Sequence, residues 1–121
     1  MNGRYIICSV FVSCLFFSCQ KSNNSQNKFT QQLYDKKLTD SLHNRALDHG
    51  DTLAYRELRM IYYLGGPRTT DFLCFALVMS NKYNFKEAAD DVYFLLNESD
   101  SILDDKTQEM ANYYLARSKS Q

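Results

Sequence analysis

The side chains that could carry chemistry in this sequence are sparse, and they form no recognisable catalytic pattern. Adjacent carboxylates occur at Asp90 and Asp91 and again at Asp104 and Asp105. Neighbours on a helix point about 100° apart, so neither pair can serve one site as acid and base. We therefore expect Asp90 and Asp91 to lie on a solvated helix face, and the second pair to open a helix, where the macrodipole favours negative charge. The sequence also lacks a Gly-rich phosphate loop and the HExxH, CxxC and GxSxG motifs.

Histidine and cysteine, the other reactive types, are equally few. Four residues of metal-ligating type gather near one expected helix junction: His43, Asp48, His49 and Asp51. Their spacing defines no coordination geometry, so the sequence predicts no metal site and no cofactor, and His43 is most simply an exposed polar residue. A hydrolase that uses His49 and nearby carboxylates stays open as an alternative. Cys74 lies in a long apolar run, where a free cysteine is usually a small buried hydrophobe rather than a nucleophile.

The N-terminal segment has the order of a secretory signal. Arg4 is followed by an apolar run over residues 5–18, and the small residue Ser18 precedes Cys19. This run has 14 residues, fewer than the roughly 20 that a membrane-spanning helix needs. The ending resembles the lipobox of bacterial lipoproteins, and its bulky Phe-Phe-Ser-Cys form is similar to the relaxed box of Bacteroidetes lipoproteins. That resemblance implies that residues 1–18 are removed as a signal peptide and that Cys19 is lipidated.

The residues after Cys19 are polar. Residues 20–29 contain a single apolar residue at their end, so we expect a flexible tether over residues 19–29. The acidic cluster that surface-exported Bacteroidetes lipoproteins carry after the cysteine is missing, and Lys21 and Lys28 stand there instead. By that resemblance the protein belongs to the cell envelope, anchored in the outer membrane and facing the periplasm. Without residues 1–18 the chain carries 13 basic and 14 acidic side chains, a net charge of −1, which argues against nucleic acid as a partner.

Residues 30–118 are expected to form one helical domain. Apolar residues recur at helical spacing from Thr30 to a stop at Gly50, over residues 51–64, over residues 71–82, from Asn84 to about residue 96, and from Asp105 onward. The third of these segments is almost wholly apolar and is expected to be the most buried. Asn84 and Glu87 resemble a capping box at the start of the fourth. Strand signals are poor. The sequence therefore predicts an all-α fold of about five helices in antiparallel pairs.

Two of the expected helices repeat each other. Ala54 aligns with Ala88, and Leu58 with Val92, at an offset of 34 residues. This is the period of tetratricopeptide repeats, which residues 71–97 resemble, and residues 50–66 are similar to the opening of Sel1-type repeats. The family glycine of the first helix is Ala76 here, and the closing proline is absent. The resemblance implies a short α-solenoid, and an irregular helical bundle is the alternative.

Tyrosine and the charged residues beside it suggest where a partner could bind. The chain has nine Tyr and no Trp, and Tyr is enriched at protein interfaces. The best candidates for a partner surface are Tyr55, Arg56, Arg59, Tyr62 and Tyr63. The alternative is that the tyrosines cap the core with their hydroxyls in water.

A short motif suggests one modification. Residues 100–102 resemble the Bacteroidetes O-glycosylation pattern, which implies Ser101 as a possible acceptor, the alternative being a plain helix-connecting turn. The pattern also occurs at Ser41 and Thr52, and Ser101 is the one expected in a loop.

These observations together predict a non-enzymatic, lipid-anchored module that contacts the membrane through the lipid on Cys19 and binds another protein in the bacterial cell envelope. One alternative is an immunity-type lipoprotein that neutralises a periplasmic toxin. A second is an enzyme whose site has no recognisable motif.

Overall fold

The computed structural model describes residues 23–67, 69–98 and 103–120, with side chains from residue 28 onward. Within these ranges the chain forms helices and no strand, which confirms the all-α prediction. The helices are α1 (Asn23–Tyr34), α2 (Lys36–His49), α3 (Thr52–Gly65), the 3₁₀ turn η1 (Thr69–Phe72), α4 (Leu73–Tyr83), α5 (Lys86–Asn97) and α6 (Asp105–Lys119). None of the helices in the described ranges is long and apolar enough to cross a membrane.

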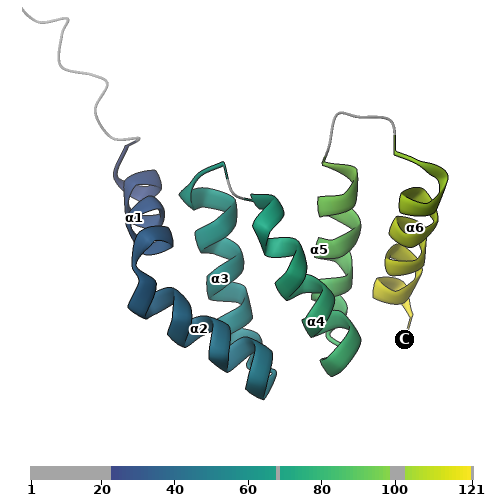
Figure 1. Ribbon diagram of the computed structural model, residues 1–121, viewed down its shortest axis with the longest axis horizontal. Coiled ribbons are helices and arrows are strands. Elements are labelled where there is room, and N and C mark those ends of the chain that lie inside the picture. Colours follow the sequence, from purple (N-terminus) through teal and green to yellow (C-terminus); the bar gives the residue numbers. More distant parts are fainter. Residues whose placement is uncertain (1–22, 68, 99–102, 121) are drawn as a thin grey trace, which may run out of the picture.

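The helices stand side by side in a row (Figure 1). The pairs α2–α3 and α4–α5 are antiparallel hairpins; α1 packs on α3 and α6 packs along α5. A further contact joins α2 to α4. These contacts join helices that lie close to one another along the row, as in a stack of helical hairpins.

The first expected helix is divided in two, because Asp35 interrupts it. Asp35 has an extended backbone (φ −76°, ψ 92°), and its carboxylate accepts a hydrogen bond from the Leu38 N–H at 3.1 Å, which caps α2. The helix before it, α1, begins at Asn23, whereas helix was expected only from Thr30. The predicted flexible tether over residues 19–29 is therefore wrong from Asn23 onward.

The apolar third segment is less buried than predicted. It forms η1 and α4, and α4 buries only Ala76, Met79 and Ser80, whereas α3 buries six residues. Apolar composition misled the prediction, because other apolar side chains of α4, among them Leu73, Phe75 and Leu77, are only partly buried against the core. Cys74 is an exposed free cysteine, so its expected burial is also wrong.

The 34-residue offset is present in the geometry of the two hairpins. Gly50 and Asn84 both adopt the left-handed conformation that ends the first helix of each pair. The same closing bond follows each of them, from the Asp51 N–H to the Arg45 carbonyl and from the Phe85 N–H to the Met79 carbonyl, both at 3.1 Å. Asn84 thus ends α4, and the predicted capping box is wrong: α5 begins after Phe85, which has no side-chain cap.

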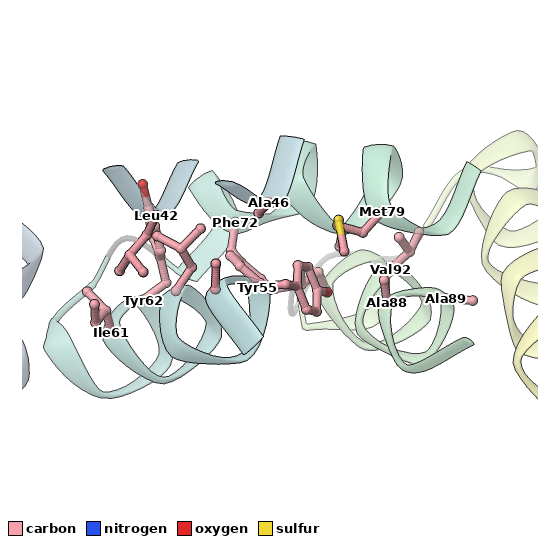
Figure 2. Close-up of a cluster of buried hydrophobic side chains, with 14 of the residues drawn as sticks. Leu42, Ala46, Tyr55, Ile61, Tyr62, Phe72, Met79, Ala88, Ala89 and Val92 are labelled. Atoms are coloured by element: carbon pink, nitrogen blue, oxygen red, sulfur yellow. The ribbon is translucent and has the colours of Figure 1, made fainter. Parts of the chain in front are cut away.

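The hydrophobic core runs along the row. Aligned residues of α3 and α5 are part of it, since the side chains of Ala54, Ala88, Leu58 and Val92 are all fully buried. Phe72 of η1 fills the space between the hairpins, with its ring centroid 5.1 Å from that of Tyr55 and 5.7 Å from that of Tyr62 (Figure 2). The 3₁₀ turn therefore supplies the aromatic ring that joins the two hairpins.

The last helix is tied to the second hairpin by polar bonds. Asp104 caps its start by accepting from the N–H groups of Lys106 and Thr107, as a helix-opening carboxylate was expected to do. At its other end, the Arg117 guanidinium donates to the Ser80 carbonyl at 2.7 Å and to the Asn84 amide oxygen at 3.2 Å.

Candidate functional site

The five residues expected to form a partner surface all lie on α3, but they do not share one exposed face. Tyr55 is fully buried and Tyr62 is 7% exposed, so neither side chain lies on the surface where it was expected. Arg56 is exposed, and Arg59 and Tyr63 are half-buried. Helix α3 is covered on one side by α1 and α2 and is tied to α5 on another, so only a strip of its surface is free.

Asp91 is the residue whose environment differs most from the one predicted. It was expected on a solvated face, yet its side chain is 2% exposed. The Tyr55 hydroxyl donates to Asp91 Oδ2 at 2.7 Å, and Arg59 Nε lies 2.8 Å from Asp91 Oδ1. Both carboxylate oxygens therefore have a donor, and the bonds join α3 to α5.

Glu87 extends this arrangement to the surface. Its carboxylate pairs with Arg56 Nε at 2.9 Å and with an Arg59 terminal nitrogen at 3.2 Å. The Arg56 guanidinium also lies 5.6 Å from the centre of the Phe85 ring. The two arginines expected to bind a partner are thus engaged with α5, and we call these five residues — Tyr55, Arg56, Arg59, Glu87 and Asp91 — the α3–α5 polar cluster.

The pKa shifts in the α3–α5 polar cluster are those of buried groups that bond to one another, which indicates a structural role. Burial raises the pKa of the Asp91 carboxyl, while the bonds from Tyr55 and Arg59 oppose this shift. Burial, together with the Asp91 charge, raises the pKa of Tyr55 far above its ordinary value, so its hydroxyl remains a donor. The buried members of the cluster are closed to solvent, and their polar atoms are occupied by one another. The α3–α5 polar cluster therefore fixes the register of α3 on α5.

His43 also differs from its expectation. It is half-buried, with its ring stacked on Phe75 at a centroid distance of 4.4 Å and with Nε2 3.4 Å from the Tyr62 hydroxyl. Burial lowers the pKa of His43, and the charge of Asp40 opposes that shift. Asp51, which was grouped with it, instead caps α3 and pairs with Arg45 at 2.6 Å. Over the described part of the chain, no three His, Cys, Asp or Glu residues gather in a way that could hold a metal ion.

The exposed apolar side chains form a surface feature that sequence reasoning missed. Met60 and Leu64 lie one turn apart near the end of α3, and Phe94 lies near the end of α5, with exposures of 48%, 43% and 51%. Tyr63, next to Leu64 in α3, stacks its ring on that of Phe94 at a centroid distance of 5.9 Å, which brings the ends of α3 and α5 together here. We call Met60, Tyr63, Leu64 and Phe94 the apolar end patch. Helical periodicity could have found it, since Met60 and Leu64 are large apolar residues four positions apart that lie off the helix face of Ala54 and Leu58.

A second group of exposed apolar residues lies on α6. Met110 is 40% exposed and Tyr113 is 56% exposed. The inward face consists of Ala111 and Tyr114, and the Tyr114 hydroxyl bonds to the Asn81 side chain. Met110 and Tyr113 are therefore available on the outer helix of the row.

Two predicted site residues, Cys19 and Ser101, lie outside the residues that the structure describes. Comparison with known proteins identifies no matching family model, no matching curated protein and no matching solved structure for this chain.

Proposed function

We propose that this protein is anchored to a bacterial membrane by lipid on Cys19 and binds another protein in the cell envelope, without catalysing a reaction. The observation that carries the anchor is the sequence around Cys19: a charged start, then a mostly apolar run of 14 residues (5–18) whose last residue, the small Ser18, directly precedes the cysteine. Acylation would hold the helical domain on the outer membrane, on the side that faces the periplasm.

The binding role is supported by the surface of the helical row. Exposed Met and Tyr are typical of the central part of protein interfaces, and α6 carries both at Met110 and Tyr113. A short stack of helical hairpins, of the tetratricopeptide or Sel1 kind that the sequence resembles, would offer such a surface to a partner. The polar cluster gives no competing enzymatic proposal, because its buried groups are engaged with one another.

The anchor is tested by labelling with a fatty-acid probe in the host. We expect label on the wild type and none on Cys19→Ala, with the unprocessed precursor accumulating. Cys14→Ala is the matched control, since Cys14 also follows a serine in the same segment, and it should be labelled normally. Label that is unaffected by Cys19→Ala would contradict the proposal.

The partner is tested by crosslinking in intact cells followed by mass spectrometry. The pair Met110→Ser and Tyr113→Ser should abolish one specific crosslink, whereas Leu53→Ser, at a leucine that is 68% exposed on α3, should retain it. A partner that is an envelope protein supports the proposed role, and a toxin encoded nearby would identify an immunity-type lipoprotein instead. Crosslinks that are identical in all variants would contradict binding through α6.

A further inference from the structure

The N-terminus of α1 lies at the edge of the row where α3 ends. Phe29 of α1 lies against Gly65, the last residue of α3: a Cβ on Gly65 would be 2.8 Å from the Phe29 carbonyl oxygen. Helix α1 begins at Asn23, six residues earlier, which is about 9 Å further along its axis. The N-terminus of α1 and the C-terminal ends of α3 and α5 therefore lie at the same end of the molecule (Figure 1).

The apolar end patch lies at this same end. Met60, Tyr63 and Leu64 belong to the last two turns of α3, and Phe94 belongs to the last turn of α5. The opposite end of α3 also carries an exposed leucine, Leu53, in its first turn. Leu53 and Leu64 are 11 residues apart on one helix, so they are separated by about 16 Å along its axis.

The chain between the proposed anchor and α1 is short. Only three residues lie between Cys19 and Asn23, and the four Cα–Cα steps that join them span at most about 14 Å when fully extended. An acylated Cys19 would thus hold this end of the molecule next to the bilayer. At such a short distance the effective concentration of the surface is high, so even a weak apolar contact would be populated.

We propose that the apolar end patch rests on the lipid surface in which Cys19 is anchored, so that the domain has one fixed orientation on the membrane. This inference rests on the proposed acylation of Cys19. The contact is apolar rather than electrostatic, because exposed carboxylates lie at the same end: Glu98 directly after α5 and Asp104 directly before α6. Leu64 and Phe94 enter the boundary between headgroups and acyl chains, while Leu53 faces away from the membrane.

The absence of tryptophan from the chain allows a direct test. Single tryptophans are introduced as Leu64→Trp, Phe94→Trp and, as the matched control on the same helix, Leu53→Trp. Each full-length protein, acylated in its host, is purified and reconstituted into phosphatidylcholine vesicles with or without brominated acyl chains, and circular dichroism verifies folding. We expect brominated lipid to remove most of the emission at positions 64 and 94 and to leave position 53 unchanged, at low and high salt alike.

The outcomes separate this inference from the proposed function. Protein that fails to float with the vesicles would contradict the anchor itself. Protein that floats but shows no quenching at positions 64 and 94, or equal quenching at all three positions, would overturn the orientation while leaving the anchor intact. Unquenched tryptophans at positions 64 and 94 that are also shielded from aqueous acrylamide would place a protein or a second copy over the patch, which likewise overturns it.

Discussion

At the scale of single residues, Asp90 and Asp91 show how strongly a neighbouring helix changes the role of a side chain. Asp90 is exposed, whereas Asp91 is buried against Tyr55 and Arg59. A buried carboxylate is tolerated only when its oxygens are bonded, and here a phenol and a guanidinium satisfy both of them. The bonds of Asp91 to Tyr55 and Arg59 therefore hold α3 and α5 in one register.

Removing the Asp91 carboxylate should destabilise the protein clearly. Asp91→Ala leaves the Tyr55 hydroxyl, which is fully buried, without its acceptor, and we expect a loss of about 2 kcal/mol in the free energy of unfolding in urea. Arg59 keeps Glu87 and part of its hydration, which limits the loss. Asp90→Ala is the matched control on the adjacent exposed residue and should change stability by less than about 0.5 kcal/mol. Similar losses in both variants would refute the structural role of Asp91.

The pH dependence of stability should carry the signature of Asp91. Burial raises the folded pKa of Asp91 above its ordinary value of 3.8, so between the two pKa values the folded state binds more protons than the unfolded state. Stability from this group therefore falls as the pH rises from about 4 through the folded pKa. Asp91→Asn has no such titration and still offers Tyr55 an acceptor oxygen. Urea unfolding over this pH range should show the wild type losing stability relative to Asp91→Asn. If the free energies of unfolding of the two proteins change in parallel with pH, the pKa of Asp91 is not raised by burial.

At the scale of elements, the junction between α2 and α3 depends on a glycine for two separate reasons. Gly50 has φ +65°, and a Cβ there would lie 2.5 Å from Cδ1 of the Tyr83 ring. The Tyr83 hydroxyl in turn donates to the Leu47 carbonyl at 2.8 Å, near the end of α2. The glycine thus both ends α2 and leaves room for the aromatic ring that holds α4 against it.

Gly50→Ala should therefore cost more than backbone strain alone. We expect about 1 kcal/mol from the left-handed conformation and about 1–3 kcal/mol from overpacking against the Tyr83 ring, measured by thermal and urea unfolding. In a Tyr83→Ala background only the backbone part should remain, so the double-mutant cycle should show coupling of more than about 0.5 kcal/mol. Fully additive effects would show that the ring does not restrict position 50.

At the scale of the whole molecule, stability should be graded along the row of helices. Helix α3 packs against α1 and α2 and bonds to α5, and α5 packs against α4 and α6. By contrast, α1 packs on α3 and α2, and α6 is held by α5 and by the bonds of Arg117 to the end of α4. In a stack with only nearest-neighbour contacts, the outer elements open first.

Native-state hydrogen exchange should reveal this gradient. Amides of α3 and α5 should exchange slowest, and those of α1 and α6 fastest. Arg117→Ala should lower the opening free energy of α6 by about 1 kcal/mol and leave exchange in α3 unchanged. Uniform protection over the described helices, or an equal effect of Arg117→Ala on α3, would indicate one cooperative unit instead.

The sequence by itself determined the features that depend on local physics. Apolar periodicity predicted an all-α fold, the stop expected at Gly50 is where α2 ends, and the helix expected over residues 51–64 corresponds closely to α3. The buried stripe of Ala54 and Leu58 followed from the same spacing. These features could be predicted because capping, backbone conformation and helix period are set by residues only a few positions apart.

Tertiary structure alone decided which helix faces are covered and by what. It buried Tyr55, Tyr62 and Asp91, which the sequence assigned to surfaces, and it exposed Cys74 in an apolar run. It also gathered Leu64 and Phe94, 30 residues apart, at the end of the molecule where α1 begins. Burial depends on contacts between helices that are distant in sequence, and the periodicity of one helix carries no information about which neighbour will lie against it.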